Sequence, residues 1–552
     1  MKIRFSAMWL VGLGAFALAG FTTGAAAGES VAPRLTWGFA GARNLAGGTD
    51  GALLRKALAQ PATVQVLKQA WEKLATAPQR LATNQVKDAS VDLRAILRPA
   101  IADLADCRSF GVWQGPTEWA VAIETGAETG DRWMRDWAAA GKVFGAGTPE
   151  SVEAGNAELK VARLADGNVA TACGRLGDWV GLAVGKDPAA RLKLFSGEVR
   201  TALEAGTDAW LELRGNPRAL TGCAMLPDAD VRITLRGEGE RVRTVGTMKF
   251  GEPLDLALDP WQLPVDAIHE PLIGFAAGRG MAPVLAKLPV FQRPELAPLP
   301  GQFCIWTLGL HPMQTYLAWP ADDPGEALKR MAPVLAEEFD RGLSVLHPAR
   351  VAYQPELNRV VVTNLINAVP FLEAGPEVAP RWIVGGLSLP LYLRGDVGPK
   401  ELFDQVTNRP DLIWFDWELT QPRLEIMWHL RTFAAMLAGY LPLSPDGAMN
   451  AWLRDPGFTE CLGNTATEVT LESPTELKLA RVSSVGFTAF ELTRLAVWLD
   501  GENFPLSTPP KTILDLPKTH AAKPVRPTPA VPRTTKPAPR KPAPVRRPTP
   551  QR

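Results

Sequence analysis

Apolar residues recur at helical intervals in the first part of the chain. Between positions 53 and 74 they are Leu54, Leu58, Val66, Leu67, Trp71 and Leu74, and between 91 and 104 they are Leu93, Ile96, Leu97, Ile101 and Leu104. Apolar positions three or four residues apart form one face of an amphipathic helix. Beyond Cys107 the pattern changes to short alternating runs with helical segments between them, which is typical of strands joined by helices. The sequence predicts a mostly helical segment over 28–108 and a mixed body after it.

Tryptophan positions indicate that the body is duplicated. Trp119, Trp179 and Trp210 have counterparts 200, 203 and 204 residues later, at Trp319, Trp382 and Trp414. The flanking residues agree as well, because an apolar run follows both Trp179 and Trp382. Self-similarity at a fixed period is the sequence signature of repeated structural units. We therefore predict repeat units over 109–270 and 271–515.

Each unit is predicted to end in a hairpin. In the first, residues 231–236 alternate apolar and polar side chains, and the chain returns through 241–250. In the second, residues 468–471 lead into a turn at Ser473-Pro474, and a largely helical insertion at about 423–464 precedes them. Alternation favours half-exposed antiparallel sheet over a buried parallel one. The expected fold class is α+β, with two related units of antiparallel sheet, helices packed on one face, a helical N-terminal segment and a disordered tail.

In this architecture the chain resembles a loose group of large, uncharacterised exported bacterial proteins. The group shares a signal peptide, an N-terminal helical segment and Trp-marked α+β repeats, as in residues 179–184 and 210–220 here. The resemblance covers roughly residues 30 to 500 of the chain. It implies an exported protein of this build, and it implies no activity.

The N-terminus has the features of a secretory signal. Lys2 and Arg4 precede an apolar stretch at 8–19, and small residues follow at Ala25, Ala26 and Ala27. This order of charged, apolar and small residues is the one that signal peptidase reads. We expect a signal peptide over 1–27, cut near Ala27 and Gly28, and a periplasmic or secreted protein. The alternative is an uncleaved anchor, for which the apolar stretch is shorter than the ~20 residues of a membrane span.

The C-terminus is expected to be a disordered, Pro/Lys/Arg-rich tail over 516–552. From Lys518 onward, 35 residues contain ten prolines, ten cations and no acid. Removing the ten tail charges and the two signal charges from the net +1 leaves a body near −11. Such a segment favours extended polyproline II over a packed core. The expected polyanion-binding residues are Lys518, Lys523, Arg526, Arg533, Lys536, Arg540, Lys541, Arg546, Arg547 and Arg552. The alternative is a spacer without a specific ligand.

Residues that would carry catalysis or metal binding are missing from the sequence. No two of the five histidines lie within twenty residues of one another, and the five cysteines, Cys107, Cys173, Cys223, Cys304 and Cys461, lack zinc-ligand spacing. Buried free thiols are the expected state, with one disulfide as the alternative. His429 is expected to be a core residue of an apolar run. No catalytic residue, metal or cofactor is predicted.

One predicted sheet face gathers arginines. Residues 231, 233 and 235 are apolar and face one way, so Arg232 and Arg236 face the other, and Arg241 and Arg243 join them across the turn. Four arginines on one face form a possible binding surface for anionic sugars or phosphates. The alternative is a solvated face neutralised by Glu238 and Glu240.

These features favour an exported, non-catalytic cell-envelope protein. Its duplicated body would serve as an interaction surface for an unknown protein partner, and its arm would contact anionic envelope polymers or lipids. The tail has no aromatic residue on which bases could stack, so no specific nucleic acid is expected. No transmembrane span is expected in the mature protein. The alternatives are an extracytoplasmic glycan-acting hydrolase with unidentified carboxylates and a purely structural protein without a ligand.

Overall fold

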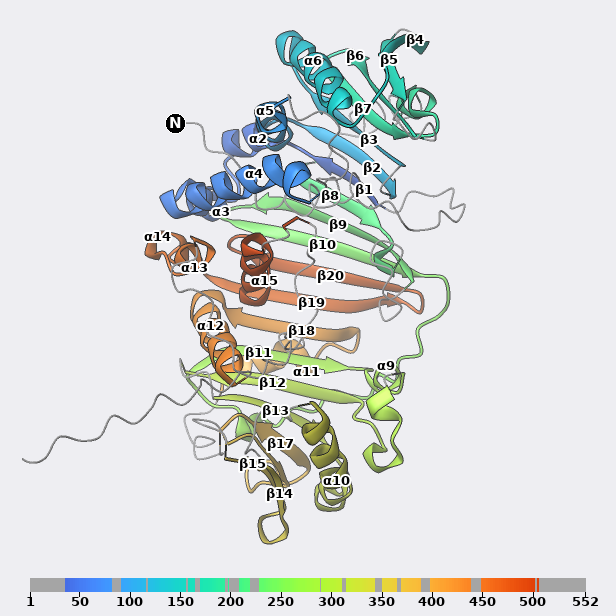
Figure 1. The fold of residues 1–552 in the computed structure, drawn as a ribbon. Helices are drawn as coiled ribbons and strands as arrows, with labels where there is room; N and C mark the ends of the chain where they lie inside the picture. The colour runs from blue at the N-terminus through green and yellow to red at the C-terminus, as the bar shows by residue number, and fades with distance from the viewer. Residues whose placement is uncertain are drawn as a thin grey trace, which may run out of the picture. The chain divides into compact units, whose positions relative to one another are not determined.

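The computed structural model describes residues 35–505, apart from gaps at 82–90, 116–117, 155–156, 164–168, 194–196, 198–207, 219–227, 288, 310–313, 343–349, 365–368, 389–397, 438–447 and 502–503. The expected signal peptide and all ten tail cations lie outside the described residues. The described chain forms a long antiparallel sheet with helices packed on it (Figure 1).

The first half of the chain contributes β1 to β10. Its elements are β1 (Leu35–Phe39), α2 (Ala42–Gly47), α3 (Ala52–Ala59), α4 (Pro61–Leu81), α5 (Leu93–Asp106), β2 (Ser109–Gly115), β3 (Glu118–Glu124), α6 (Ala127–Val143), β4 (Glu150–Ala154), β5 (Ala157–Arg163), β6 (Ala170–Leu176), β7 (Trp179–Gly185), β8 (Leu211–Gly215), β9 (Ala229–Glu238) and β10 (Arg241–Phe250). The last two strands form the predicted hairpin, whose two-residue turn contains Gly239 at φ 57°. Primed hairpin turns need positive φ, which glycine adopts without strain.

The second half contributes β11 to β20. Its elements are β11 (Leu272–Arg279), α9 (Ala282–Leu285), β12 (Gln302–Leu308), β13 (Thr315–Pro320), α10 (Pro324–Gly342), β14 (Arg350–Gln354), β15 (Arg359–Thr363), β16 (Phe371–Ala374), β17 (Trp382–Gly386), α11 (Lys400–Thr407), β18 (Leu412–Leu419), α12 (Thr420–Leu437), α13 (Ala448–Leu453), α14 (Pro456–Thr459), β19 (Asn464–Ser473), β20 (Glu476–Ser483) and α15 (Ala489–Asp500). The expected helical insertion before the second hairpin corresponds to α12, α13 and α14.

The strands of the described residues pair in one continuous antiparallel order. That order is β4, β5, β6, β7, β3, β2, β1, β8, β9, β10, β20, β19, β18, β11, β12, β13, β17, β16, β15, β14. Read outward from the β10–β20 junction, both halves have the same topology, so β1 corresponds to β11, β8 to β18 and β9 to β19. Two related antiparallel units and the α+β class are confirmed.

The junction between the halves has two-fold pseudosymmetry. The two hairpin turns make Arg241 and Glu476 equivalent positions, because each is the first residue after its turn. Counting from them, Val245 is equivalent to Ala480, and these two residues pair directly with each other. A pseudo-two-fold axis therefore passes between Val245 and Ala480. The halves join as two identical subunits would through their edge strands.

The tryptophan landmarks correspond only in part. Trp179 and Trp382 are each the first residue of equivalent strands, β7 and β17, as predicted. Trp119 pairs near the end of β7, with Val184, whereas Trp319 pairs with Ile383 near the start of β17. The predicted equivalence of Trp119 and Trp319 is therefore wrong. With 18 tryptophans in the chain, one match of this kind arises by chance.

The first repeat begins earlier than residue 109. β1 lies between β2 and β8 in the sheet and corresponds to β11, although it falls in the segment expected to be a separate helical one. A five-residue strand separated from its partners by α2 to α5 has no local signal that links it to them. The helices α2 to α5 are thus an insertion between the first two strands of the first repeat.

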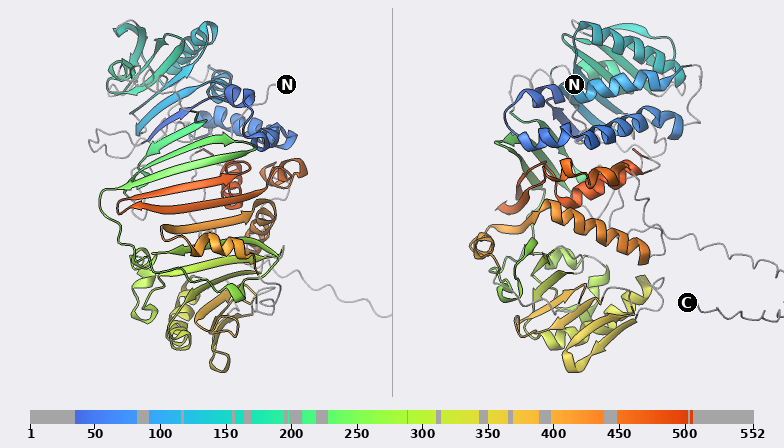
Figure 2. Two further views of the ribbon diagram at one scale, coloured as in Figure 1. Left: turned by 180° about the vertical axis from the view of Figure 1, so that it is seen from behind. Right: turned by 90° about the vertical axis from the view of Figure 1, so that its left-hand side faces the viewer.

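Helices cover both faces near the ends of the sheet and one face at its centre. Trp133 of α6 packs with Val121 and Ile123, whereas Leu192 packs with Ala120 and Ala122 on the opposite face of β3. At the centre, α3, α4, α12 and α15 lie on one face, which we call the helix-covered face (Figure 1). Seen from behind, β9, β10, β20 and β19 are uncovered (Figure 2).

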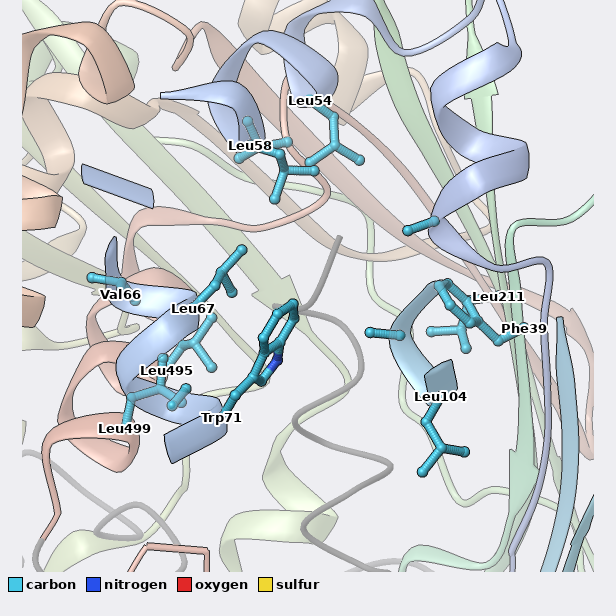
Figure 3. Close-up of a cluster of buried hydrophobic side chains, with 14 of the residues drawn as sticks. Phe39, Leu54, Leu58, Val66, Leu67, Trp71, Leu104, Leu211, Leu495 and Leu499 are labelled. Atoms are coloured by element: carbon cyan, nitrogen blue, oxygen red, sulfur yellow. The ribbon is translucent and has the colours of Figure 1, made fainter. Parts of the chain in front are cut away.

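The largest core lies under these central helices and includes residues from both halves. Leu67 and Trp71 of α4 pack near Leu495 and Leu499 of α15 (Figure 3). Lys73 Nζ on α4 also donates to the Leu499 carbonyl at 2.6 Å. The N-terminal helices therefore cover the junction and pack on the last helix of the second half.

Gly111→Ala should destabilise the protein strongly, because Trp37 of β1 lies directly over Gly111 of β2. A Cβ at Gly111 would sit 1.9 Å from Trp37 Cζ2. Overpacking of this kind typically costs about 1–3 kcal/mol and occasionally more. Gly115→Ala is the matched control, because the same strand leaves its Cβ position with nothing within 4 Å. Urea unfolding of both variants tests this, and equal midpoints would contradict the packing of β1 on β2.

Candidate functional site

The uncovered central surface, which we call the open face, takes alternate residues of β8, β9, β10, β20 and β19. Ala229 and Leu235 of β9 are buried on the helix-covered side. The alternate residues Asp230, Arg232 and Thr234 therefore point to the open face. The open face is polar over the first-half strands β8, β9 and β10 and beside the turn between β19 and β20. Its charged residues there are Glu212, Arg214, Asp230, Arg232, Arg236, Glu238, Arg241, Arg243, Lys249 and Glu476. Lys478, which follows Glu476 on the same face of β20 and pairs with Thr247, adds a further cation, so seven cations stand against four carboxylates there.

A groove of about 520 Å³ lies on this face beside the pseudo-two-fold axis. It is lined by Arg214, Asp230, Arg232, Thr234, Val245, Gly246, Thr247, Lys249 and Glu476. The lining combines three cations, two carboxylates and two hydroxyls around one valine. Such a surface can hold a charged group by ion pairs and hydrogen bonds.

Like charges lie directly opposite each other at two places on the open face. Arg214 pairs with Arg232 in the ladder between β8 and β9, and Arg236 pairs with Arg243 between β9 and β10. Like charges in directly opposed positions destabilise a sheet. These opposed arginines therefore lower the stability of the sheet. They also concentrate positive charge on one face, which a surface that binds anions would need.

Carboxylates compensate some of these arginines. Arg214 Nη2 lies 2.8 Å from Asp230 Oδ2, and this hydrogen bond raises the pKa of Arg214. Arg232 Nε lies 2.9 Å from Glu212 Oε1. These pairs are largely exposed, so each contributes about 0–1 kcal/mol and can exchange for a ligand.

The four arginines predicted from the sequence all lie on the open face. Arg232 is paired with Glu212, and Arg243 Nη1 lies 3.2 Å from Glu238 Oε2. Arg236 and Arg241 are exposed and have no ion pair within the described part of the chain. The face is therefore partly neutralised, as the alternative interpretation expected, and two of its cations are uncompensated.

A second polar site, missed by the sequence analysis, lies on the helix-covered face of β18. Asp416 and Glu418 alternate along this strand and point toward α12 and α15. Glu418 is 5% exposed, and its Oε1 accepts a hydrogen bond of 2.7 Å from the Ala489 amide at the start of α15. Burial raises the pKa of Glu418 to about 7 and also raises the pKa of Asp416.

Two arginines complete this buried charge cluster. Arg423 of α12 donates to Thr307 Oγ1 on β12, and burial lowers its pKa while Glu418 and Asp416 oppose that shift. Arg481 of β20 pairs with Glu491 of α15 at 2.8 Å. The cluster connects both helices to the sheet through charges.

The equivalent region of the first half is apolar. Strand pairing makes Leu213 equivalent to Asp416, and Trp37 equivalent to Ala276 opposite it. Leu213 and Trp37 belong to the central core. Apolar side chains can therefore fill this position of the fold, as they do in the first half. The second half has a charge cluster there instead.

The sequence contained a signal for Asp416 and Glu418. They are alternate acids inside the strand run Leu412–Leu419, which is otherwise mostly apolar. Two acids facing the same way in a strand bounded by apolar residues indicate a buried pair.

The histidines and cysteines show no catalytic arrangement among the described residues. His429 is exposed on α12, so its predicted core position is wrong, because it lies one turn after the exposed Glu425, on the same side of the helix. Cys107, Cys173, Cys304 and Cys461 are free and buried, as predicted. Burial raises the pKa of Cys173 to about 12. Cys223, His311, His347 and His520 lie outside the described residues.

Within the described ranges, no group of three or more histidine, cysteine or acidic side chains is placed to hold a metal ion. No helix there is long and apolar enough to cross a membrane. Comparison with models of protein families, with curated proteins and with solved structures finds no match.

Proposed function

We propose that the protein is an exported, non-catalytic cell-envelope protein that binds anionic envelope polymers or lipids. The open face is its ligand site, and the basic tail makes a second contact. The observation that carries this proposal is the groove beside the pseudo-two-fold axis, with Arg214, Arg232 and Lys249 in its lining. Export is supported by the signal-like residues at 1–27, and the tail contact by its ten cations without an acid.

Binding to anionic vesicles or acidic wall polymer at low salt should need both contacts. Each cation near an anionic surface contributes about 1 kcal/mol, so the double variant Arg214→Ala/Arg232→Ala should weaken binding about 25-fold. Truncation after Pro517 should weaken it further, and physiological salt should reduce both effects by screening. Co-sedimentation of full-length, truncated and substituted protein measures this.

Arg330→Ala, an exposed arginine of α10 outside the groove, is the matched control and should bind as the unaltered protein does. Equal binding by the double variant and the control would show that the open face does not bind the ligand. Equal binding by full-length and truncated protein would make the tail a spacer.

A second candidate function is glycan hydrolysis, favoured by Trp414, Asp416 and Glu418 on one face of β18. Glycosidases use two carboxylates, one with a raised pKa that serves as the acid. We rank it second because Glu418 already accepts the Ala489 amide, so anchoring α15 accounts for its burial. Sugar release from wall glycans by the unaltered protein, lost in Asp416→Asn, would establish this candidate, and no release would remove it.

A further inference from the structure

The two sides of the open face differ although their backbones correspond. Across the pseudo-two-fold axis, Arg232 is equivalent to Ala466, because Arg232 pairs with Thr247 and Ala466 pairs with Val482. One strand farther out, Arg214 pairs with Arg232 and Trp417 pairs with Ala466. The positions of Arg214 and Arg232, the two arginines of the groove, are thus occupied by apolar residues in the second half.

These apolar residues are contiguous. Val245 pairs with Ala480 at the axis, Val482 pairs with Ala466, and Ala466 pairs with Trp417. All five are half-buried, and their neighbours on the helix-covered side, such as Thr467 and Ser483, are the buried ones. We call Val245, Ala480, Val482, Ala466 and Trp417 the apolar strip. Charged residues border the strip. Arg243 of β10 pairs with Val482, and Glu468 of β19, which Arg409 pairs at 3.3 Å, pairs with Ala480. Lys478 is the next residue from Ala480 on this face of β20.

The apolar strip therefore adjoins the charged groove on one continuous face. The groove lies at β9 and β10, and the strip extends from β10 to β18. Strands are about 4.8 Å apart, so the three spacings from β10 to β18 span about 14 Å. This length is close to half the ~30 Å hydrocarbon core of a bilayer and hence to one lipid chain. A ligand that matches both sides is charged at one end and apolar along the other.

We propose that the open face binds a single lipid with an anionic head group. The head lies in the groove between Arg214 and Arg232, with Lys249 beside it, and a hydrocarbon chain crosses the axis over the apolar strip. This inference rests on the proposed function and narrows its ligand from polymers and lipids to lipids. The two groove arginines, Arg214 and Arg232, have Trp417 and Ala466 at the equivalent positions across the axis, so the far end of the ligand meets apolar side chains there.

The test compares ligands that share a head group. The probes are a short-chain phosphatidic acid below its micelle concentration, glycerol phosphate, and a glycerol-phosphate polymer, each titrated into the full-length protein by calorimetry. We expect the lipid to bind at least tenfold more tightly than glycerol phosphate, because only the lipid covers the strip. Equal affinities, or tighter binding of the polymer per phosphate, would overturn the inference.

Substitutions at two positions, Arg232 and Val482, separate the two ends of the ligand. Arg232→Ala should weaken the lipid and glycerol phosphate alike, whereas Val482→Thr should weaken only the lipid, by about threefold or more. Val482→Glu should abolish the lipid preference, and Val482→Thr keeps the test valid if the glutamate variant unfolds. Unchanged lipid affinity in Val482→Thr would contradict a chain over the strip. If polymer binding nevertheless depends on Arg232, the open face is still a site for anions, and only the lipid inference is wrong.

Discussion

Arg423→Ala should lower the free energy of unfolding by about 3–5 kcal/mol, the cost of removing one partner from a buried ion cluster. Arg423 supplies the positive charge between Asp416 and Glu418, and it donates to Thr307 on β12. Without it, two buried carboxyl groups lose their compensating charge, and α12 loses its polar contact with the sheet. Guanidinium unfolding followed by tryptophan fluorescence measures the change.

Arg423→Met separates charge from packing, because methionine keeps much of the aliphatic stem. It should be nearly as destabilising as Arg423→Ala if the charge is what matters. Arg330→Ala, at an exposed position of α10, should change stability by less than about 0.5 kcal/mol. A loss below about 1 kcal/mol in both Arg423 variants would show that the cluster contributes little to the fold.

Glu418→Gln should stabilise the protein above neutral pH by up to about 3 kcal/mol. The carboxyl pKa rises from 4.5 to about 7 on folding, because burial penalises the charged form. The folded state therefore binds the proton more tightly, so stability contributed by this group is present at low pH and is lost as pH rises from 4.5 to 7. At about 1.4 kcal/mol per pKa unit, this loss is about 3 kcal/mol. Glutamine keeps the acceptor for the Ala489 amide and has no charge to bury.

Thermal unfolding between pH 4.5 and 8 tests this linkage. The difference between Glu418→Gln and the unaltered protein should grow as the pH rises. Glu425→Gln, at an exposed position of the neighbouring α12, should give a pH profile parallel to that of the unaltered protein. A constant difference across the range would mean that Glu418 is already ionised at pH 5.

Local patterns predicted much of this fold. Strict alternation over 231–236 predicted β9, and the helical intervals near Leu67 and Trp71 predicted α4. The pairing of β10 with β20 was not predictable, because the strands are separated by more than 200 residues and either could have paired elsewhere. β1 was missed for the same reason. Its five residues have partners only in β2 and β8.

The sequence predicted the arginines of the open face but not the buried charge cluster on the helix-covered face. Arg232, Arg236, Arg241 and Arg243 were assigned to one surface because alternation determines the face of every residue in a hairpin. The groove, however, also needs Arg214 and Glu476, which strand order brings to the same place from β8 and β20. Asp416 and Glu418 were overlooked because many acids occur in this chain, and only the covering helices show which are buried.

Photo-crosslinking from the groove tests whether the open face binds envelope lipids. Thr247 lines the groove, and the four described cysteines are buried, so a Thr247→Cys variant that also carries Cys223→Ser can be labelled selectively with a photoreactive group. Lys329→Cys on α10 in the same background is the control, because Lys329 is exposed and lies away from the groove. We expect envelope lipids to crosslink to position 247 and not to position 329. Equal capture at both positions, or capture only at 329, would contradict the open face as the ligand site.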